Sequence, residues 1–300
     1  MLFKTASALA ALYLTNLISA APAAVSSMSG IHGKKAVAGL RPSSNSTSKV
    51  HNYATVDITY QGGPIMTGAI TVYPIYYGTW SATQKDIVST FVDGISSTGW
   101  WNIEETYTNS AGAAVTGPVS VGKEYDDNYS LGKSLADNDI ETIVSNAIAN
   151  GLPTDTNGIY AVLTAGDVAE TSGFCSQYCG WHTYATINGA TLKYLFAGRA
   201  DACLSSCVAS TNSASSPNGD VPVDGMISVL AHEIVESGSD PELNAWYDST
   251  GQENADKCAW TFGTTQAATN GGQYNVVSGG KQYLIQQNWS AKDQKCEQSA

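Results

Sequence analysis

The sequence contains few charged residues, and few of these are basic. Asp, Glu, Lys and Arg make up 13% of its 300 residues, and 14 basic residues stand against 26 acidic ones, for a formal net charge of −12. The basic residues form no cluster along the chain. Because nucleic acid and anionic membrane surfaces repel a protein of this charge, the sequence excludes both as partners.

Long hydrophobic runs are absent after the first residues of the chain. No later stretch approaches the ~20 consecutive apolar residues that a transmembrane helix needs. Residues 1–20 combine one early cation, Lys4, with an Ala- and Leu-rich run and then small residues, which is the layout of a secretory signal peptide. We therefore expect cleavage close to Ala20 and a soluble protein in the extracellular space or the cell wall.

Large apolar side chains are also scarce between residues 21 and 54, which are rich in Ser, Ala, Gly and Pro. Such a composition cannot bury enough surface to order itself, so we expect a flexible or processed segment. No composition break divides residues 55–300, and a stretch of this length can form one domain. The sequence thus predicts a single domain over 55–300, acting as a monomer.

Strand and helix signals alternate in this domain. β-Branched and aromatic residues predict strands over 68–78 and 158–166, whereas apolar residues at helical spacing predict helices over 81–96 and 137–151. Asn188-Gly189 and Gly279-Gly280 each separate two strand-like runs, as in β-hairpins. Helices packed against a sheet indicate the α+β class.

The six cysteines indicate disulfide bonds, because their number is even and the chain is expected to be secreted. Four of them form two CxxxC motifs, Cys175 with Cys179 and Cys203 with Cys207. Each motif can close on itself, or the two can cross-link each other, while Cys258 and Cys296 would bond near the C-terminus. A four-cysteine zinc site is the alternative, disfavoured by the oxidising compartment and the wide spacing.

Three Asn-x-Ser/Thr sequons begin at Asn45, Asn128 and Asn288. In a secreted chain each permits N-linked glycosylation. The sequence therefore predicts a glycoprotein and leaves open which of the three sequons carries sugar.

The stretch AHEIVESGSDPELNAWYD, residues 231–248, belongs to the helix with the most informative polar residues. We predict this helix over 224–237, with Asp224 as N-cap and Gly238 just past its end. Its apolar side should face the core. His232 and Glu236, four residues apart, lie one above the other on nearly the opposite side.

The spacing His-Glu-x-x-Glu is half of the HExxH device, in which two histidines hold zinc and the glutamate between them polarises a water. A histidine with a carboxylate is a harder ligand pair than two histidines, so it tolerates Mn²⁺ or Ca²⁺ better. The alternative is a solvated helix face on which Glu233 and Glu236 are simply exposed.

Further ligands are available elsewhere in the chain. His182 lies in the stretch CGWH, where a histidine that caps a strand end is the alternative interpretation. The stretch WYDSTGQENADKC supplies Asp248, Glu253 and Asp256. This density of acids in a weakly charged chain favours a metal-binding loop, although acidic turns are commonly just solvated.

The motifs resemble a known family. The stretch PNGDVPVDGMISVLAHEIVESGSDPELNAWYD, with the upstream IYAVLTAGDVAETSGFCSQYCGWHTY and the downstream ENADKC, is similar to the phosphate-induced protein 1 family, which includes the plant EXORDIUM proteins. The similarity covers roughly residues 68–298. It implies a secreted, cell-wall or apoplastic protein that is associated in plants with growth control.

The family's motifs are matched by six candidate residues: His182 in CGxH, His232, Glu233 and Glu236 in the helix, and Glu253 and Asp256 in acid-x-x-acid-x-Cys. Asp240 is not carried over, because the plant proteins often have Asn there. The first 67 residues depart from the plant pattern.

The motifs and the family resemblance together predict a single zincin-like α+β domain, in which a mixed sheet carries helices, hairpins and disulfide-stapled loops. Under a cleft, a divalent metal, zinc before other ions, would be held by His232 and Glu236 together with His182, Glu253 or Asp256. Glu233 would be the general base in metal-assisted hydrolysis of an extracellular peptide.

A non-catalytic binding or growth-signalling protein is the alternative, because the second histidine of HExxH is missing. Its 16 tyrosines and 7 tryptophans would stack on the sugar rings of cell-wall polysaccharide. Other enzyme mechanisms have less support, since a GxSxG elbow is absent and the cysteines can all pair. Glycosidase carboxylates leave no spacing signature, so that mechanism stays open.

Overall fold

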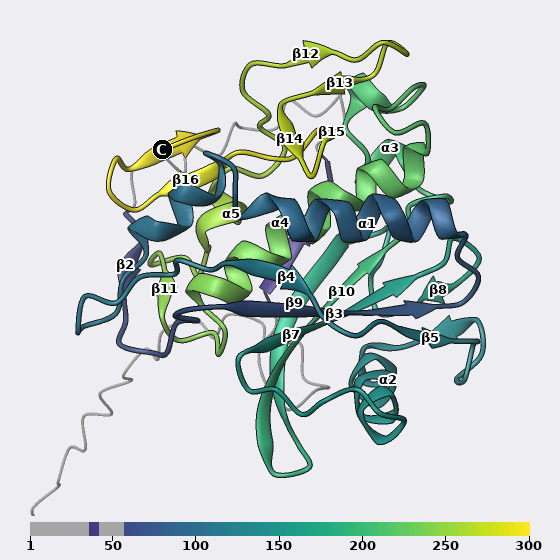
Figure 1. Cartoon of the computed structure of the whole chain (residues 1–300), viewed down its shortest axis with the longest axis horizontal. Helices are drawn as coiled ribbons and strands as arrows, with labels where there is room; N and C mark the ends of the chain where they lie inside the picture. The colour runs from purple at the N-terminus through teal and green to yellow at the C-terminus, as the bar shows by residue number, and fades with distance from the viewer. Residues whose placement is uncertain (1–35, 42–56) are drawn as a thin grey trace, which may run out of the picture.

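The computed structural model describes residues 36–41 and 57–300 (Figure 1). The expected signal peptide and most of the segment 21–54 lie outside the described residues. Four residues of that segment, Ala36–Gly39, form strand β1, which pairs antiparallel with β9. In the described part of the chain, no helix is both long and apolar enough to cross a membrane.

A seven-stranded mixed sheet lies at the centre of the fold (Figure 1). Its strands, in the order in which they lie side by side, are β1, β9 (Tyr178–Ile187), β10 (Ala190–Gly198), β7 (Gly158–Thr164), β3 (Ile70–Tyr77) and β4 (Val119–Val121), with β5 (Tyr125–Asp127) also on β3. The pairs among β10, β7, β3, β4 and β5 are parallel, whereas β1, β9 and β10 are antiparallel. The predicted strands β3 and β7 and the Asn188-Gly189 hairpin are confirmed.

Helices cover both faces of this sheet. Helices α1 (Ala82–Ile95) and α4 (Val221–Ser239) pack on one face, and α2 (Asp137–Ala149) packs on the other (Figure 1). Strand β7 shows the division, because Ile159, Ala161 and Leu163 join the core on the α4 side while Tyr160 and Val162 join the core on the α2 side. The mixed α+β class is therefore confirmed.

Shorter elements complete the chain. The Gly279-Gly280 turn joins β14 (Val276–Ser278) to β15 (Lys281–Tyr283), as predicted, and this hairpin packs on α1. The others are β2 (Thr59–Tyr60), η2 (Trp101–Thr106), β6 (Ser134–Leu135), β8 (Ala169–Glu170), α3 (Leu204–Cys207), η3 (Ser210–Asn212), β11 (Trp246–Tyr247), α5 (Asn254–Lys257), β12 (Gln266–Ala267), β13 (Gln273–Tyr274), β16 (Asn288–Ser290) and β17 (Lys295–Glu297).

Three disulfides connect the six cysteines: Cys175–Cys203, Cys179–Cys207 and Cys258–Cys296. The two CxxxC motifs cross-link each other, and the alternative four-cysteine zinc site is wrong because every thiol is consumed. The first two bonds tie the start of β9 to the segment around α3.

Helix α4 starts earlier and ends later than predicted. Its N-cap is Asp220, whose side chain accepts from the backbone of Val223, and Pro222 occupies the first turn. A proline is well tolerated in a first turn, because the backbone N–H groups there have no helical partner. Asp224 lies one turn inside, where it accepts a hydrogen bond from Ser216 at 2.5 Å, and Gly238 is within the helix rather than after it.

Candidate functional site

Helix α4 is buried all round. The side expected to face the core does so, but His232, Glu233 and Glu236 on the rest of the helix are only 2%, 0% and 0% exposed. The alternative of a solvated helix face is therefore wrong. Buried ionisable groups need partners, and these three find them on β9, α5 and the segment before β16.

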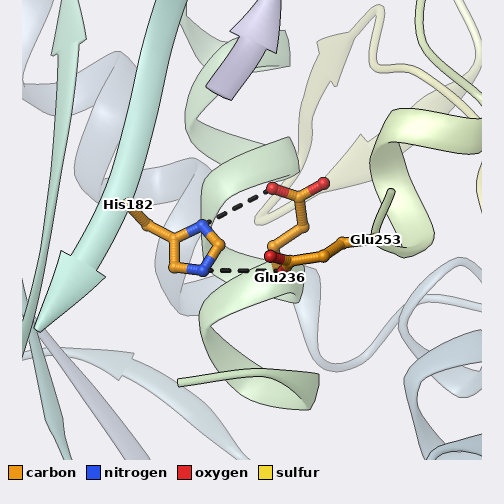
Figure 2. A group of neighbouring side chains, drawn as sticks. All are labelled: His182, Glu236 and Glu253. Carbon is orange, nitrogen blue, oxygen red and sulfur yellow. Dashed lines mark ion pairs between the residues drawn. The ribbon is translucent and has the colours of Figure 1, made fainter. Parts of the chain in front are cut away.

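Strand β9 supplies His182, which is fully buried and lies against α4. Its Nδ1 is 3.3 Å from Glu233 Oε2 and 3.5 Å from Glu236 Oε2, and its Nε2 is 3.6 Å from Glu253 Oε2. Figure 2 shows the imidazole extending from β9 toward Glu236 on α4 and Glu253 next to α5, with an ion-pair contact to each. His182 thus contacts three acids, unlike a histidine that merely caps a strand.

Helix α5 brings Glu253 and Asp256 to the same place. Glu253 is the N-cap of this short helix. Its backbone N–H donates to the side chain of Asp256, which lies three residues later in the sequence. The backbone N–H of Asp256 in turn donates to Glu236 Oε1 at 3.1 Å. Asp248, the third acid of the predicted metal-binding loop, does not join these side chains. Its carboxylate instead forms an ion pair with Lys257 at 3.2 Å.

His232 is held from both ends of its ring. Its Nε2 is 2.9 Å from Glu236 Oε1 and 3.5 Å from Asp256 Oδ1, and its Nδ1 is 3.4 Å from Gln286 Oε1. Gln286 Oε1 also accepts a hydrogen bond from the backbone N–H of Trp260, which identifies this atom as the amide oxygen. Because an oxygen of this kind only accepts, the proton between His232 and Gln286 belongs to Nδ1. The same arrangement orients histidine ligands in metal sites. No sequence signal marks Gln286.

We call these six side chains the carboxylate–imidazole cluster: His182, His232, Glu233, Glu236, Glu253 and Asp256. Its least satisfied atoms are deeply buried and make ion-pair contacts within the cluster but no hydrogen bond of regular geometry: His182 Nε2, His232 Nε2, Glu236 Oε2 and Glu253 Oε2. Such atoms are rare in folded proteins, and a site for an ion is one of the accepted explanations.

The cluster contains two groups of three residues whose ligand atoms lie within 4.8 Å of one another, and both groups include Glu236. They are His182, Glu236 and Glu253, and His232, Glu236 and Asp256. Ligand atoms about 2.1 Å from a tetrahedral ion stand about 3.4 Å apart. The contacts of 2.9 to 3.6 Å at the two imidazole Nε2 atoms fit that spacing. Glu233 belongs to neither group.

Burial and neighbouring charges shift the pKa values of the cluster. Burial raises the pKa of Glu233 to about 7, against the opposing hydrogen bond with His182. Burial also acts to raise the pKa of Glu236, but His232 and His182 outweigh it and lower this pKa to about 2. Although burial lowers the pKa of His182, Glu233 and Glu236 raise it to about 10. Without a cation the acids hold protons on the imidazoles, and a bound cation would replace those protons.

Strand β1 covers Glu233. The backbone N–H of Ala38 donates to Glu233 Oε1 at 3.3 Å, and Trp260 Nε1 donates to the Gly39 carbonyl at 3.0 Å. The expected cleft is therefore closed over Glu233 by the chain itself. Asp256 is the most open member of the cluster, with 16% of its side chain exposed, so the approach from solvent is along α5.

A further buried acid, Glu104 of η2, lies beside α5 and β16. Its Oε1 accepts from Asn254 Nδ2 at 2.5 Å and from Asn288 Nδ2 at 2.8 Å, while its Oε2 has no hydrogen-bond partner. Burial raises the pKa of Glu104 well above its ordinary value, and the charge of Glu236 adds to this. Nothing in the local sequence distinguishes Glu104 from a surface acid.

Comparison with known proteins confirms the family resemblance. The profile described as "Phosphate-induced protein 1 conserved region" matches residues 58–299. Protein EXORDIUM-like 3 of Arabidopsis thaliana is 38% identical, over 78% of this chain and 81% of the relative. Protein PHOSPHATE-INDUCED 1 of Nicotiana tabacum is 29% identical, over 76% of this chain and 83% of its own length. No solved structure matches the chain.

Proposed function

The chain belongs to the phosphate-induced protein 1 family, and we propose that it binds a divalent cation in its carboxylate–imidazole cluster. One observation carries the proposal. Buried nitrogen and oxygen atoms without hydrogen-bond partners, from β9, α4 and α5, converge within ligand-to-ligand distance of one another.

The first binding position consists of His232, Glu236 and Asp256. His232 and Glu236 are one helical turn apart, and Asp256 is fixed beside them by its backbone hydrogen bond to Glu236. One imidazole and two carboxylates suit zinc and also admit harder ions such as Mn²⁺. In this limited sense the arrangement is zincin-like: an HExxE helix lies against a mixed sheet with its ligand pair a turn apart.

The site acts outside the cell in this proposal. Three disulfides are typical of oxidising compartments, and the start of the sequence has the layout of a signal peptide.

Metal content tests the binding proposal. We expect purified full-length protein, loaded with Zn²⁺ and dialysed, to retain at least one equivalent by elemental analysis, and His232→Ala to retain one equivalent fewer than the wild type. Asp224→Asn is the matched control, because Asp224 is a buried carboxylate on the same helix with partners outside the cluster. Wild-type protein that retains no Zn²⁺, Mn²⁺ or Ca²⁺ contradicts the proposal.

Metal-assisted hydrolysis of a peptide is the finer candidate, and one observation favours it. Glu233 follows the ligand His232 directly, and its pKa is raised to about 7, which suits a general base near neutral pH. A bound ion would supply a polarised water. Glu233 would take the proton of that water and pass it to the leaving amine.

A Glu233→Gln variant separates hydrolysis from a non-catalytic role. Because Glu233 belongs to neither ligand group, the variant should retain the metal but lose cleavage of a fluorogenic peptide library. Equal cleavage by both proteins would exclude Glu233 as the base. Metal binding without any cleavage by the wild type would favour the alternative, a cell-wall binding protein.

A further inference from the structure

We propose that the carboxylate–imidazole cluster holds two cations, with the Glu236 carboxylate as the bridge between them. This inference rests on the proposed cation binding and adds a second position, formed by His182, Glu253 and Glu236.

The two oxygens of Glu236 are directed to different partners. Oε1 is 2.9 Å from His232 Nε2 and 3.1 Å from the backbone nitrogen of Asp256. Oε2 is 3.5 Å from His182 Nδ1, on the other side of the carboxylate's ligand set, and makes no hydrogen bond of regular geometry. A carboxylate whose oxygens serve separate ligand groups on either side is positioned to bridge two ions about 3.5 to 4 Å apart.

Both histidines are prepared in the same way. His232 Nδ1 faces Gln286 Oε1 at 3.4 Å, and His182 Nδ1 faces Glu233 Oε2 at 3.3 Å. In each ring the remaining atom, Nε2, is buried, makes no hydrogen bond of regular geometry and contacts only acids: Glu236 and Asp256 for His232, and Glu253 for His182. An acceptor on one ring nitrogen that leaves the other free for a cation is the usual support of a histidine ligand. Both His182 and His232 have this support.

The charge of the cluster also fits two ions better than one. Four acids, Glu233, Glu236, Glu253 and Asp256, are gathered within it, and their ion pairs run to His182 and His232. With neutral imidazoles and all four carboxylates ionised, as cation binding favours, one divalent ion would leave two negative charges in a buried site, which is costly. Two divalent ions balance four carboxylates.

Stoichiometry tests the inference on the intact protein. After chelation and reloading with Zn²⁺, we expect elemental analysis to give two equivalents for the wild type. Glu253→Gln and Asp256→Asn should each give one, and Glu236→Gln should give none or one loosely held. Asp248→Asn is the control, because Asp248 is a neighbouring buried acid outside the cluster, and it should keep two.

A second measurement needs no variant and so does not depend on a variant's folding. Two Mn²⁺ ions that share a carboxylate give an exchange-coupled electron paramagnetic resonance spectrum, which we expect from wild-type protein loaded with Mn²⁺. One equivalent of zinc together with an isolated six-line Mn²⁺ spectrum overturns the second position and leaves the proposed function intact. Zero equivalents overturn both.

Discussion

Close approach between α4 and β9 depends on one residue without a side chain, Gly180. A Cβ at this position would lie 2.5 Å from Val229 Cγ1, 2.7 Å from the Phe196 carbonyl oxygen and 3.2 Å from Glu233 Oε1. Gly180 is thus the reason that His182, two residues later on the same strand, reaches the acids of α4.

A Gly180→Ala substitution should therefore push helix and strand apart. We expect it to lower the free energy of unfolding by about 1–3 kcal/mol and to weaken cation binding, measured by chemical denaturation and by zinc titration. Gly39→Ala is the control, since a Cβ there meets nothing within 4 Å. Unchanged stability and affinity in Gly180→Ala would show that the gap between α4 and β9 is adjustable.

The sequons differ in what surrounds their asparagines. Asn288 is fully buried, with its Nδ2 donating to Glu104, whereas Asn128 is exposed. Asn45 lies outside the described residues. We expect mass spectrometry of secreted protein to find sugar on Asn128 and none on Asn288. Asn288→Gln should leave the glycan mass unchanged, and a glycopeptide that contains Asn288 would contradict this expectation.

At the scale of the elements, Glu104 is the contact between η2, α5 and β16. Its folded-state pKa lies above the ordinary value of 4.5, so its contribution to stability is complete below about pH 4.5 and is lost as the pH rises toward the folded pKa. Ionisation of Glu104 would place an uncompensated charge between the three elements.

A Glu104→Gln variant should remove this dependence, because the amide keeps the acceptor oxygen and does not ionise. Between pH 5 and pH 8 we expect the wild type to lose stability relative to Glu104→Gln in urea denaturation. The exposed neighbour Glu105 provides the control, as Glu105→Gln should follow the wild type. Parallel pH profiles for all three proteins would place the Glu104 charge in solvent.

Elements whose apolar residues recur at a regular spacing could be predicted from the sequence. Elements whose ends are fixed by contacts with distant residues could not. Helix α1 has its apolar residues at helical spacing and a Ser81 capping box, so its bounds follow from local chemistry. For helix α4, the sequence contains two Asp residues one turn apart, and either could be the N-cap. The choice of Asp220 depends on burial of Asp224 by Ser216 and Asn218, which no local pattern reports.

The candidate site shows the same limit. The HExxE spacing predicted that His232 and Glu236 would meet, because a helical turn fixes their distance. The scarcity of histidines and the density of acids after the helix suggested His182, Glu253 and Asp256, the family resemblance matched them to its motifs, and the fold brings them together. The roles of Gln286, Gly180 and Glu104 arise from contacts between residues far apart in the sequence, so neither composition nor spacing could indicate them.

For the whole molecule, the cluster joins β9, α4 and α5 across the centre of the fold, so a bound cation should stabilise the entire domain. At a free-ion concentration of about 100 times Kd, the expected gain is roughly 2.7 kcal/mol, or a rise in Tm of roughly 5 to 10 °C. We expect a chelator to lower the Tm by this amount in calorimetry, and zinc to restore it. Glu236→Gln should respond to neither treatment.

Strand β1 comes from the chain before residue 42 and occupies the outer edge of the sheet directly above Glu233. A protease cut after residue 41 would release this strand and leave the backbone of β9 unpaired along that edge. Unpaired edges accept an extended polypeptide as a new strand. Removal of the N-terminal segment would thus expose, in one step, a strand edge that can bind an extended peptide and the Glu233 carboxylate beneath it.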